Sequence, residues 1–328
     1  MINIAVIGAG RIGAIHAGNV ASHPQTRLAW VSDPVPAARA RLAPLGACLT
    51  SDPAEAIVAA DVDAVIVCSP TPTHVNLIRL ATAAGKPVLC EKPVDLDLAR
   101  AVDCLATVGG PVMIGFNRRF DPSFAEVRAR VAAGEIGQVE QLTIISRDPA
   151  PPGPEYVAVS GGLFRDMTIH DFDMARFFLG PIATVRAAGQ NLVDPRIGEL
   201  GDIDGAVVIL TAASGATATI LNSRRCAYGY DQRLEAFGSA GLLEARNQYA
   251  TSVAVSCAAT TGARGRVQDF FLERYAAAYR LELDAFVRAI TAGEAPRPDL
   301  RDGCEALNLA DAALRSLATG AAVTVPSL

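Results

Sequence analysis

Two short segments of the sequence combine acidic, basic and imidazole side chains at spacings that suit proton transfer. The first is Glu91-Lys92-Pro93, which follows the apolar run 88–90. Partial burial next to a strand end lowers the pKa of a lysine, so Lys92 is a candidate proton-transfer residue. Glu91 would pair with Lys92 or contact a bound cofactor. The alternative interpretation is an ordinary surface lysine at a strand end.

The second segment, 161–174, contains Asp166, His170 and Asp173 at spacings of four and three residues. In an α-helix these spacings place all three side chains on one stripe. A carboxylate beside an imidazole fixes its tautomer and stabilises its protonated form, which suits an alcohol that loses a proton as its carbon loses hydride. The alternative is that Asp166 caps the helix and His170 packs as a core residue.

A glycine-rich turn near the start of the sequence predicts a dinucleotide site. The apolar run 2–7 leads into G-x-G-x-x-G, and a helix-compatible segment follows. In such turns one glycine allows the tight turn, the next lets the backbone approach a pyrophosphate, and the last allows close helix packing. The unpaired amides of the helix start face the phosphates. The predicted cofactor-binding residues here are Gly8, Gly10, Arg11, Ile12 and Gly13.

Asp33 ends the second strand-like run, 28–32, about twenty residues after Gly13, where an acid binds the adenosine ribose. A carboxylate there accepts hydrogen bonds from the ribose hydroxyls and repels a 2′-phosphate, so we expect NAD rather than NADP. No arginine follows at once, because Pro34-Val35-Pro36 comes next. The alternative makes the glycines an ordinary loop and Asp33 a helix cap.

Strand-like runs alternate with helical patterns through the first part of the chain, which predicts a doubly wound parallel sheet of the α/β class, a Rossmann domain. The expected strands are 3–7, 28–32, 64–68, 88–90 and 112–115, and the expected helices are 11–21, 37–45, 52–60, 73–84 and 96–108. Ligands bind beyond the carboxyl ends of such strands. Three polar loops follow strands there, with Ser69, Thr71 and His74 in one, Glu91 and Lys92 in the next, and Asn117 and Arg118 in the last. We expect the first two loops to contact the cofactor, although His74 also fits a simple helix start.

The pattern changes after about residue 120, which divides the chain into predicted domains 1–119 and 120–328. A helix is expected over 123–133, a strand over 138–147 and a Pro-rich loop over 149–154. Hairpin signals at 206–221 and 233–245 indicate a largely antiparallel sheet. Long helical patterns follow at 269–292 and 302–318. The second domain is therefore expected to be α/β with a large, mostly antiparallel sheet.

Composition favours a globular protein that acts on small molecules. The chain has 328 residues, of which 51% are hydrophobic, and a net charge of -5. It offers no basic field for nucleic acid or an anionic membrane. Seven scattered cysteines without C-x-x-C pairs indicate neither a zinc site nor a disulfide framework, and no other metal cluster is expected. Without a signal-like or spanning segment, the reducing cytoplasm is the expected location.

These motifs resemble the Gfo/Idh/MocA oxidoreductases, and within them the bacterial inositol 2-dehydrogenases, over essentially the whole chain. The Glu-Lys-Pro element marks the family at large. The stretches that look specifically like inositol dehydrogenases are Phe164 to Met174 and Tyr228-Gly229-Tyr230-Asp231-Gln232. The other matching stretches are 8–13, 115–122, 146–149 and 222–225.

The resemblance implies that NAD and a cyclic polyol meet between the two domains and that an open sheet in the second domain forms a homotetramer. Lys92, Asp166 and His170 match the family's catalytic residues. By this analogy the axial hydroxyl of myo-inositol loses its proton through Lys92 and His170 as hydride passes to NAD, giving 2-keto-myo-inositol, and Asp166 orients the network. The implied substrate contacts are Lys92, Asp166, His170, Asn117 and Arg118, together with Asp173, Tyr228 and Tyr279 from the second domain. Inositol catabolism is the implied setting.

Several alternatives stay open. Some family members have a histidine where this sequence has Ser146-Arg147, so a scyllo-inositol or aldose dehydrogenase remains a competing prediction. From other classes, an NAD-dependent glycosidase and a non-catalytic NAD-binding sensor remain. The proton-transfer residues argue against the sensor.

Overall fold

The computed structural model describes residues 1–328, and the chain divides into two compact units. Unit 1 contains Met1–Phe120, Ala278–Leu307 and Leu328, and unit 2 contains Asp121–Ala277 and Asn308–Ser327. The chain first passes from unit 1 to unit 2 after Phe120, next to the predicted domain boundary after residue 119. The return of residues 278–307 to unit 1 was not predicted from the sequence. Tyr279 therefore belongs to unit 1 and not, as expected, to the second domain.

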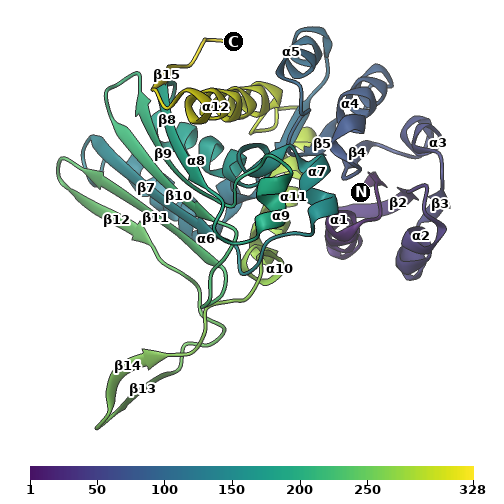
Figure 1. The fold of residues 1–328 in the computed structure, drawn as a ribbon. Helices are drawn as coiled ribbons and strands as arrows, with labels where there is room; N and C mark the ends of the chain where they lie inside the picture. The colour runs from purple at the N-terminus through teal and green to yellow at the C-terminus, as the bar shows by residue number, and fades with distance from the viewer. The chain divides into compact units, whose positions relative to one another are not determined.

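Unit 1 is built on a six-stranded parallel sheet with the order β3-β2-β1-β4-β5-β6 (Figure 1). This is the doubly wound Rossmann order, so the predicted fold of this part is confirmed. The strands are β1 (Ile2–Ile7), β2 (Thr26–Ser32), β3 (Cys48–Thr50), β4 (Ala64–Val67), β5 (Val88–Glu91) and β6 (Val112–Gly115). The sequence analysis missed β3, a three-residue edge strand whose Cys48 and Leu49 are exposed and so carry no apolar pattern.

Helices connect the strands of unit 1, and they are α1 (Arg11–Ser22), α2 (Pro36–Leu42), α3 (Pro53–Val58), α4 (His74–Ala83) and α5 (Leu98–Thr107). Short 3-10 turns are η1 (Ala43–Leu45), η2 (Thr71–Thr73) and η3 (Asn117–Phe120). A later helix, α11 (Ala276–Ala292), completes the core, because its Leu283, Phe286 and Val287 pack with Ile4 and Met113. This packing explains why 278–307 belongs to unit 1.

Unit 2 is built on a seven-stranded sheet with the order β12-β11-β7-β10-β9-β8-β15. Only β7 and β10 pair in parallel, so the predicted mostly antiparallel sheet is confirmed. The strands are β7 (Val139–Arg147), β8 (Ile182–Gln190), β9 (Gly205–Ala212), β10 (Thr217–Ser223), β11 (Asp231–Gly238), β12 (Gly241–Ala245) and β15 (Val323–Thr324). The β9–β10 and β11–β12 hairpins occur where the sequence predicted them, whereas β8 and β15 were missed.

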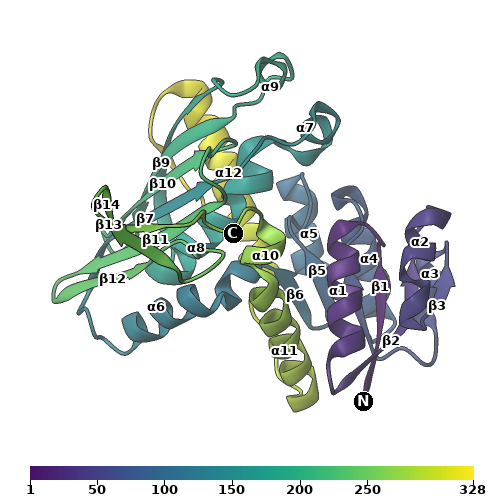
Figure 2. The same ribbon diagram turned by 90° about the horizontal axis from the view of Figure 1, so that it is seen from below.

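Two helices cover one face of this sheet (Figure 2). They are α8 (Ile169–Leu179) and the part of α12 (Leu300–Thr319) that belongs to unit 2. Ser146 of β7 donates a hydrogen bond to Asp171 of α8, and the amide of Ala187 in β8 donates to Ser316 of α12. The other helices that begin in this unit are α6 (Pro122–Ala132), α7 (Pro154–Ser160), α9 (Pro195–Glu199) and α10 (Phe271–Arg274). The predicted helix 269–292 is thus two helices, α10 and α11.

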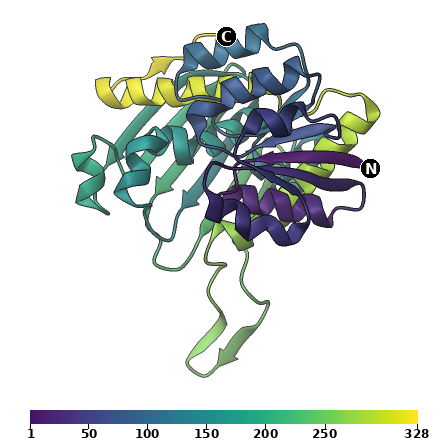
Figure 3. The ribbon, with the colours of Figure 1, turned by 90° about the vertical axis from the view of Figure 1, so that its right-hand side faces the viewer.

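The opposite face of the seven-stranded sheet carries apolar side chains that remain exposed. Val207, Ile209, Phe237 and Leu242 are 41%, 46%, 43% and 49% exposed. A hairpin of β13 (Ala254–Cys257) and β14 (Thr260–Arg264), all of whose residues are exposed, extends beyond the rest of the unit (Figure 3). No helix of the protein combines the length and the apolar character that crossing a membrane requires.

Candidate active site

The glycine turn of unit 1 has the backbone geometry of a phosphate cradle. Gly8 has a φ of +98°, and a Cβ there would lie 2.7 Å from the backbone of Cys68. A Cβ on Gly13 would lie 1.8 Å from the Gly8 oxygen, so the helix packs against the turn. A Cβ on Gly10 would meet no atom within 4 Å, and no side chain caps α1. The free helix N-terminus and the open space at Gly10 fit a pyrophosphate.

Asp33 joins the end of β2 to this turn. Its Oδ2 accepts a hydrogen bond from the Ala9 amide at 2.7 Å, and its Oδ1 accepts one from the Val35 amide at 2.8 Å. The N-cap of α2 is Val35, so Asp33 does not cap the helix as the alternative interpretation held. Each oxygen keeps a lone pair for a ribose hydroxyl. The carboxylate is therefore fixed next to the glycine turn, in a position that fits the predicted ribose contact.

The loop after β4 contains the predicted contacts Ser69, Thr71 and His74. Ser69 and Thr71 are half-buried, and the Ser69 hydroxyl lies 2.6 Å from that of Thr73. His74 is buried, with Nδ1 2.8 Å from the Pro93 oxygen and Nε2 2.8 Å from the Ser69 oxygen. Burial lowers the pKa of His74, against the opposing effect of these two carbonyls. This position favours a structural role for His74, as a link between two loops, over the predicted cofactor contact.

The strand β5 ends at Glu91, and Lys92 and Pro93 follow it, joined by a cis peptide bond. Lys92 is half-buried, as the sequence predicted. The side chain of Glu91 is directed to α1, where its Oε1 lies 3.0 Å from Nε2 of His16. Glu91 thus anchors the segment that presents Lys92. Its predicted contact with the cofactor stays a prediction.

The remaining predicted substrate contacts of unit 1 are buried. Asn117 and Arg118 lie in η3, directly after β6, and are 3% and 4% exposed. Tyr279 of α11 is 6% exposed, and its ring meets the His16 ring edge-on with 5.6 Å between centroids. Asn117 and Arg118 follow the carboxyl end of β6, where a Rossmann sheet binds ligands.

Asp166 lies in a wide helical turn, η4 (Phe164–Thr168), that leads into α8. This π-helical turn replaces the single α-helical stripe that the sequence predicted, and such turns are frequent at functional sites. Thr168 is the N-cap of α8, so Asp166 does not cap it. Oδ1 of Asp166 accepts a hydrogen bond from the Tyr156 hydroxyl at 2.9 Å, and Oδ2 lies 3.6 Å from Nη1 of the buried Arg224. Asp166 is therefore held from two sides.

The first turns of α8 are fixed to the sheet by a buried polar network. Asp171 is fully buried and accepts hydrogen bonds from Ser146 at 2.7 Å and from Asn222 at 2.8 Å. Thr168 donates to Asn222 at 2.7 Å. His170 is half-buried on this helix, and Asp173 is fully buried. The network includes Ser146 of β7 and positions the helix turn that carries His170.

Tyr228 lies half exposed at the end of the sheet. Its hydroxyl donates to Oδ2 of Asp231 at 2.5 Å and accepts from Arg147 at 3.1 Å. Burial and the bond to Asp231 raise the pKa of Tyr228. Burial alone would raise the pKa of Asp231, but hydrogen bonds from Arg233, Tyr228 and Asn247 lower it to about 2. Tyr228 thus belongs to a polar cluster with Asp231, and its predicted substrate contact stays a prediction.

Sequence reasoning missed the side chains that support the predicted residues, above all His16 and Arg224. Arg224 continues the inward-facing register of β10, in which residues 218, 220 and 222 are buried. His16 occupies the buried face of α1 together with Gly13, Ala17 and Val20. In both cases the available signal was a polar residue at a position that the periodicity assigns to the core.

Comparisons with known proteins agree with this geometry. Residues 2–115 match the oxidoreductase family with an NAD-binding Rossmann fold, and residues 124–244 match the GFO/IDH/MocA C-terminal domain. An inositol 2-dehydrogenase of Rhizobium meliloti is 48% identical over 327 residues, which cover 97% of each chain.

Solved structures extend the comparison. The crystal structure of a myo-inositol dehydrogenase from Corynebacterium glutamicum superimposes with a TM-score of 0.96 at 49% identity and covers 100% of both chains. A scyllo-inositol dehydrogenase from Lactobacillus casei, solved with NAD(H) and scyllo-inositol, has a TM-score of 0.91 at 31% identity and covers 100% of both chains. Both halves of the sequence and the whole fold lead to one conclusion: the chain belongs to the Gfo/Idh/MocA family of NAD-binding oxidoreductases.

Proposed function

We propose that this protein is an NAD-dependent inositol 2-dehydrogenase that oxidises myo-inositol to 2-keto-myo-inositol. The observation that carries the proposal is the end-to-end identity of 48–49% to proteins named for this activity, together with an Asp166–His170 segment held by the network described above. The scyllo-inositol dehydrogenase is more distant at 31% identity, which favours the myo epimer.

The chemistry divides between the cofactor and the chain. Bound NAD would supply the acceptor for the hydride that leaves the substrate carbon. The glycine turn and the N-terminus of α1 would hold the pyrophosphate of NAD. The carboxylate of Asp33 would accept hydrogen bonds from the hydroxyls of the adenosine ribose. The single hydroxyl proton is taken up within the network of Lys92 Nζ and the His170 imidazole, and Asp166 orients the imidazole. Asn117, Arg118 and Asp173 are the proposed partners of the other hydroxyls, because a polyol pairs polar groups that an apolar substrate would leave unpaired.

The direct test is the formation of NADH by the purified protein with myo-inositol, scyllo-inositol, D-glucose or D-xylose, repeated with NADP. We expect the highest kcat/KM with myo-inositol and NAD. A preference for scyllo-inositol or an aldose would overturn the choice of substrate and keep the reaction type. Bound NAD without turnover of any polyol would overturn the dehydrogenase assignment.

We also propose that the protein is a homotetramer of the cytoplasm. The exposed apolar face of the seven-stranded sheet supports the association, since an apolar patch of this kind marks an interface. Seven free cysteines support a reducing compartment. Light scattering after size exclusion is expected to give the mass of a tetramer, and Ile209→Asp on this face is expected to give smaller species. A monomeric wild type would contradict the proposal.

A further inference from the structure

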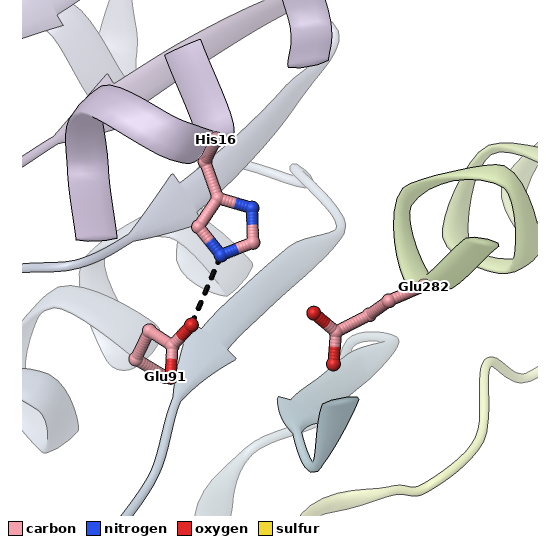
Figure 4. A group of neighbouring side chains, drawn as sticks. All are labelled: His16, Glu91 and Glu282. Atoms are coloured by element: carbon pink, nitrogen blue, oxygen red, sulfur yellow. Dashed lines mark hydrogen bonds and ion pairs between the residues drawn. The ribbon is translucent and has the colours of Figure 1, made fainter. Parts of the chain in front are cut away.

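Three titratable side chains from separate elements meet inside unit 1. His16 comes from α1, Glu91 from the end of β5 and Glu282 from α11. One ring nitrogen of His16 and one carboxyl oxygen of each glutamate lie within 4.8 Å of one another. His16 is 1% exposed and Glu282 is 0% exposed. Figure 4 shows the Glu282 carboxyl directed from α11 toward the pair formed by His16 and Glu91.

The hydrogen bonds within this group are unequal. Glu91 and His16 are bonded to each other at 3.0 Å. Both carboxyl oxygens of Glu282 are buried without a hydrogen-bond partner, and so is Nδ1 of His16. A carboxylate ion in such a place would lack the donors or the cation that stabilise a buried charge. A neutral carboxylic acid avoids most of that cost.

The electrostatic surroundings of Glu282 also favour a neutral carboxylic acid. Burial, and then the charge of Glu91, raise the pKa of Glu282 well above its usual value. The half-buried Cys68 follows β4, and the pKa of its thiol is raised by burial and then by the charge of Glu91. Tyr279, one turn before Glu282 on α11, packs its ring edge-on against that of His16. Neither Glu91 nor Cys68 supplies a positive charge to Glu282.

We propose that Glu282 is a positioning residue, kept as a neutral carboxylic acid, that fills the space beside the Glu91–His16 pair without repelling it and thereby fixes the strand end that presents Lys92. If Glu282 were ionised, it would repel Glu91 from His16. Because Lys92 is the next residue, its Nζ would move with Glu91, and displacements of about 1 Å at a reacting group cost up to about 100-fold in rate. The inference rests on the proposed catalytic role of Lys92.

Two substitutions separate charge from shape. Glu282→Gln keeps the shape of the neutral acid, so kcat is expected to stay within about threefold of wild type. Glu282→Ala removes the support, and kcat is expected to fall about tenfold or more while the Kd for NAD changes little. Glu294→Gln, an exposed site just beyond the end of α11, is the matched control. An equal loss of kcat in Glu282→Gln and Glu282→Ala would overturn the proposal.

The pH profile gives a readout that a merely structural role would not move. In the wild type and in Glu294→Gln, kcat is expected to fall at alkaline pH as Glu282 ionises. Glu282→Gln cannot ionise there, so this part of the fall is expected to disappear. Superimposable profiles for wild type and Glu282→Gln would contradict the proposal.

Infrared spectroscopy tests the proton itself, without reference to catalysis. The wild type at neutral pH is expected to show the carbonyl band of a protonated carboxylic acid, which Glu282→Gln loses and Glu294→Gln keeps. The absence of that band in the wild type overturns the proposal. So does a stoichiometric divalent metal found by elemental analysis and lost in Glu282→Gln, since a metal ligand is ionised. A band that is present while Lys92→Ala stays fully active would instead refute the proposed role of Lys92.

Discussion

The Nη1 atom of Arg224 lies 3.6 Å from Oδ2 of Asp166, and Nη2 of the same guanidinium lies 3.7 Å from Oδ2 of Asp202. Arg224 is 1% exposed, so its charge is buried between two carboxylates. Asp202 in turn accepts a hydrogen bond from the Leu163 amide at 3.1 Å. One buried cation thus connects the end of β10 to the helical turn that carries Asp166.

Arg224→Gln is expected to lower kcat/KM for the polyol about tenfold or more and to destabilise the protein by about 3 kcal/mol, because a buried ion pair loses one partner. Steady-state kinetics and denaturant unfolding measure the two effects. The neighbouring Arg225 is exposed, so Arg225→Gln is the control and is expected to stay within about 0.5 kcal/mol of wild type. Unchanged kinetics in Arg224→Gln would mean that this contact does not position Asp166 for catalysis.

Lys92→Ala is expected to lower kcat about 100-fold or more, because a positioned proton acceptor is lost. The Kd for NAD, measured by fluorescence titration, is expected to change little, since the glycine turn and Asp33 are untouched. Near wild-type turnover in the purified variant would remove Lys92 from the mechanism.

Asp33→Ser is expected to shift the ratio of kcat/KM for NAD over NADP toward NADP by about tenfold or more, because the carboxylate no longer repels the 2′-phosphate. The variant also loses acceptors for the Ala9 and Val35 amides, so its Tm is measured in parallel. An unchanged preference for NAD in a folded variant would show that another residue selects the cofactor.

Two glycines of α1 offer a matched pair. A Cβ on Gly13 would lie 1.8 Å from the Gly8 oxygen, whereas one on Gly18 meets nothing within 4 Å. Gly13→Ala is expected to abolish measurable NAD binding, and Gly18→Ala is expected to stabilise the protein by about 0.5–1 kcal/mol through helix propensity. Calorimetric titration and thermal unfolding measure these effects. NAD binding of wild-type affinity by Gly13→Ala would refute the tight packing of the turn.

Acid is expected to weaken unit 2 through Asp231. The folded pKa of Asp231 is about 2, below the ordinary value of 3.8. A carboxyl with a depressed pKa contributes stability above its unfolded pKa, and this contribution is lost as the pH falls through the folded pKa. The free energy of unfolding of wild type is therefore expected to fall more steeply between about pH 4 and pH 2 than that of Asp231→Asn. Parallel curves for the two proteins would contradict this assignment.

The sequence predicted the doubly wound parallel sheet of unit 1 well, because its buried parallel strands are continuous apolar runs joined by amphipathic helices. It also placed both hairpins of unit 2, where alternation and turn residues coincide. It missed β3 and β15, which are three and two residues long and lie at sheet edges, too short to show a period. The return of α11 to unit 1 depends on tertiary packing, which local sequence patterns do not predict.

The sequence predicted those residues of the candidate site that belong to short local motifs. The glycine spacing, Asp33 and the Glu-Lys-Pro element can each be recognised from the residues next to them in the sequence. The supports of these residues cannot, because His16 and Glu282 are separated by most of the chain and Arg224 lies far from Asp166 in the sequence. The wide turn η4 was also invisible, since the spacing of Asp166 and His170 suits an ordinary α-helix.

The most direct test of the account follows the hydrogen that leaves the substrate. Purified protein is supplied with NAD and myo-inositol that carries deuterium on the carbon of the axial hydroxyl, and the reduced cofactor and the product are analysed by mass spectrometry. We predict that the deuterium appears in the reduced cofactor and that the product is 2-keto-myo-inositol. Unlabelled reduced cofactor, or a product oxidised at another carbon, would contradict it.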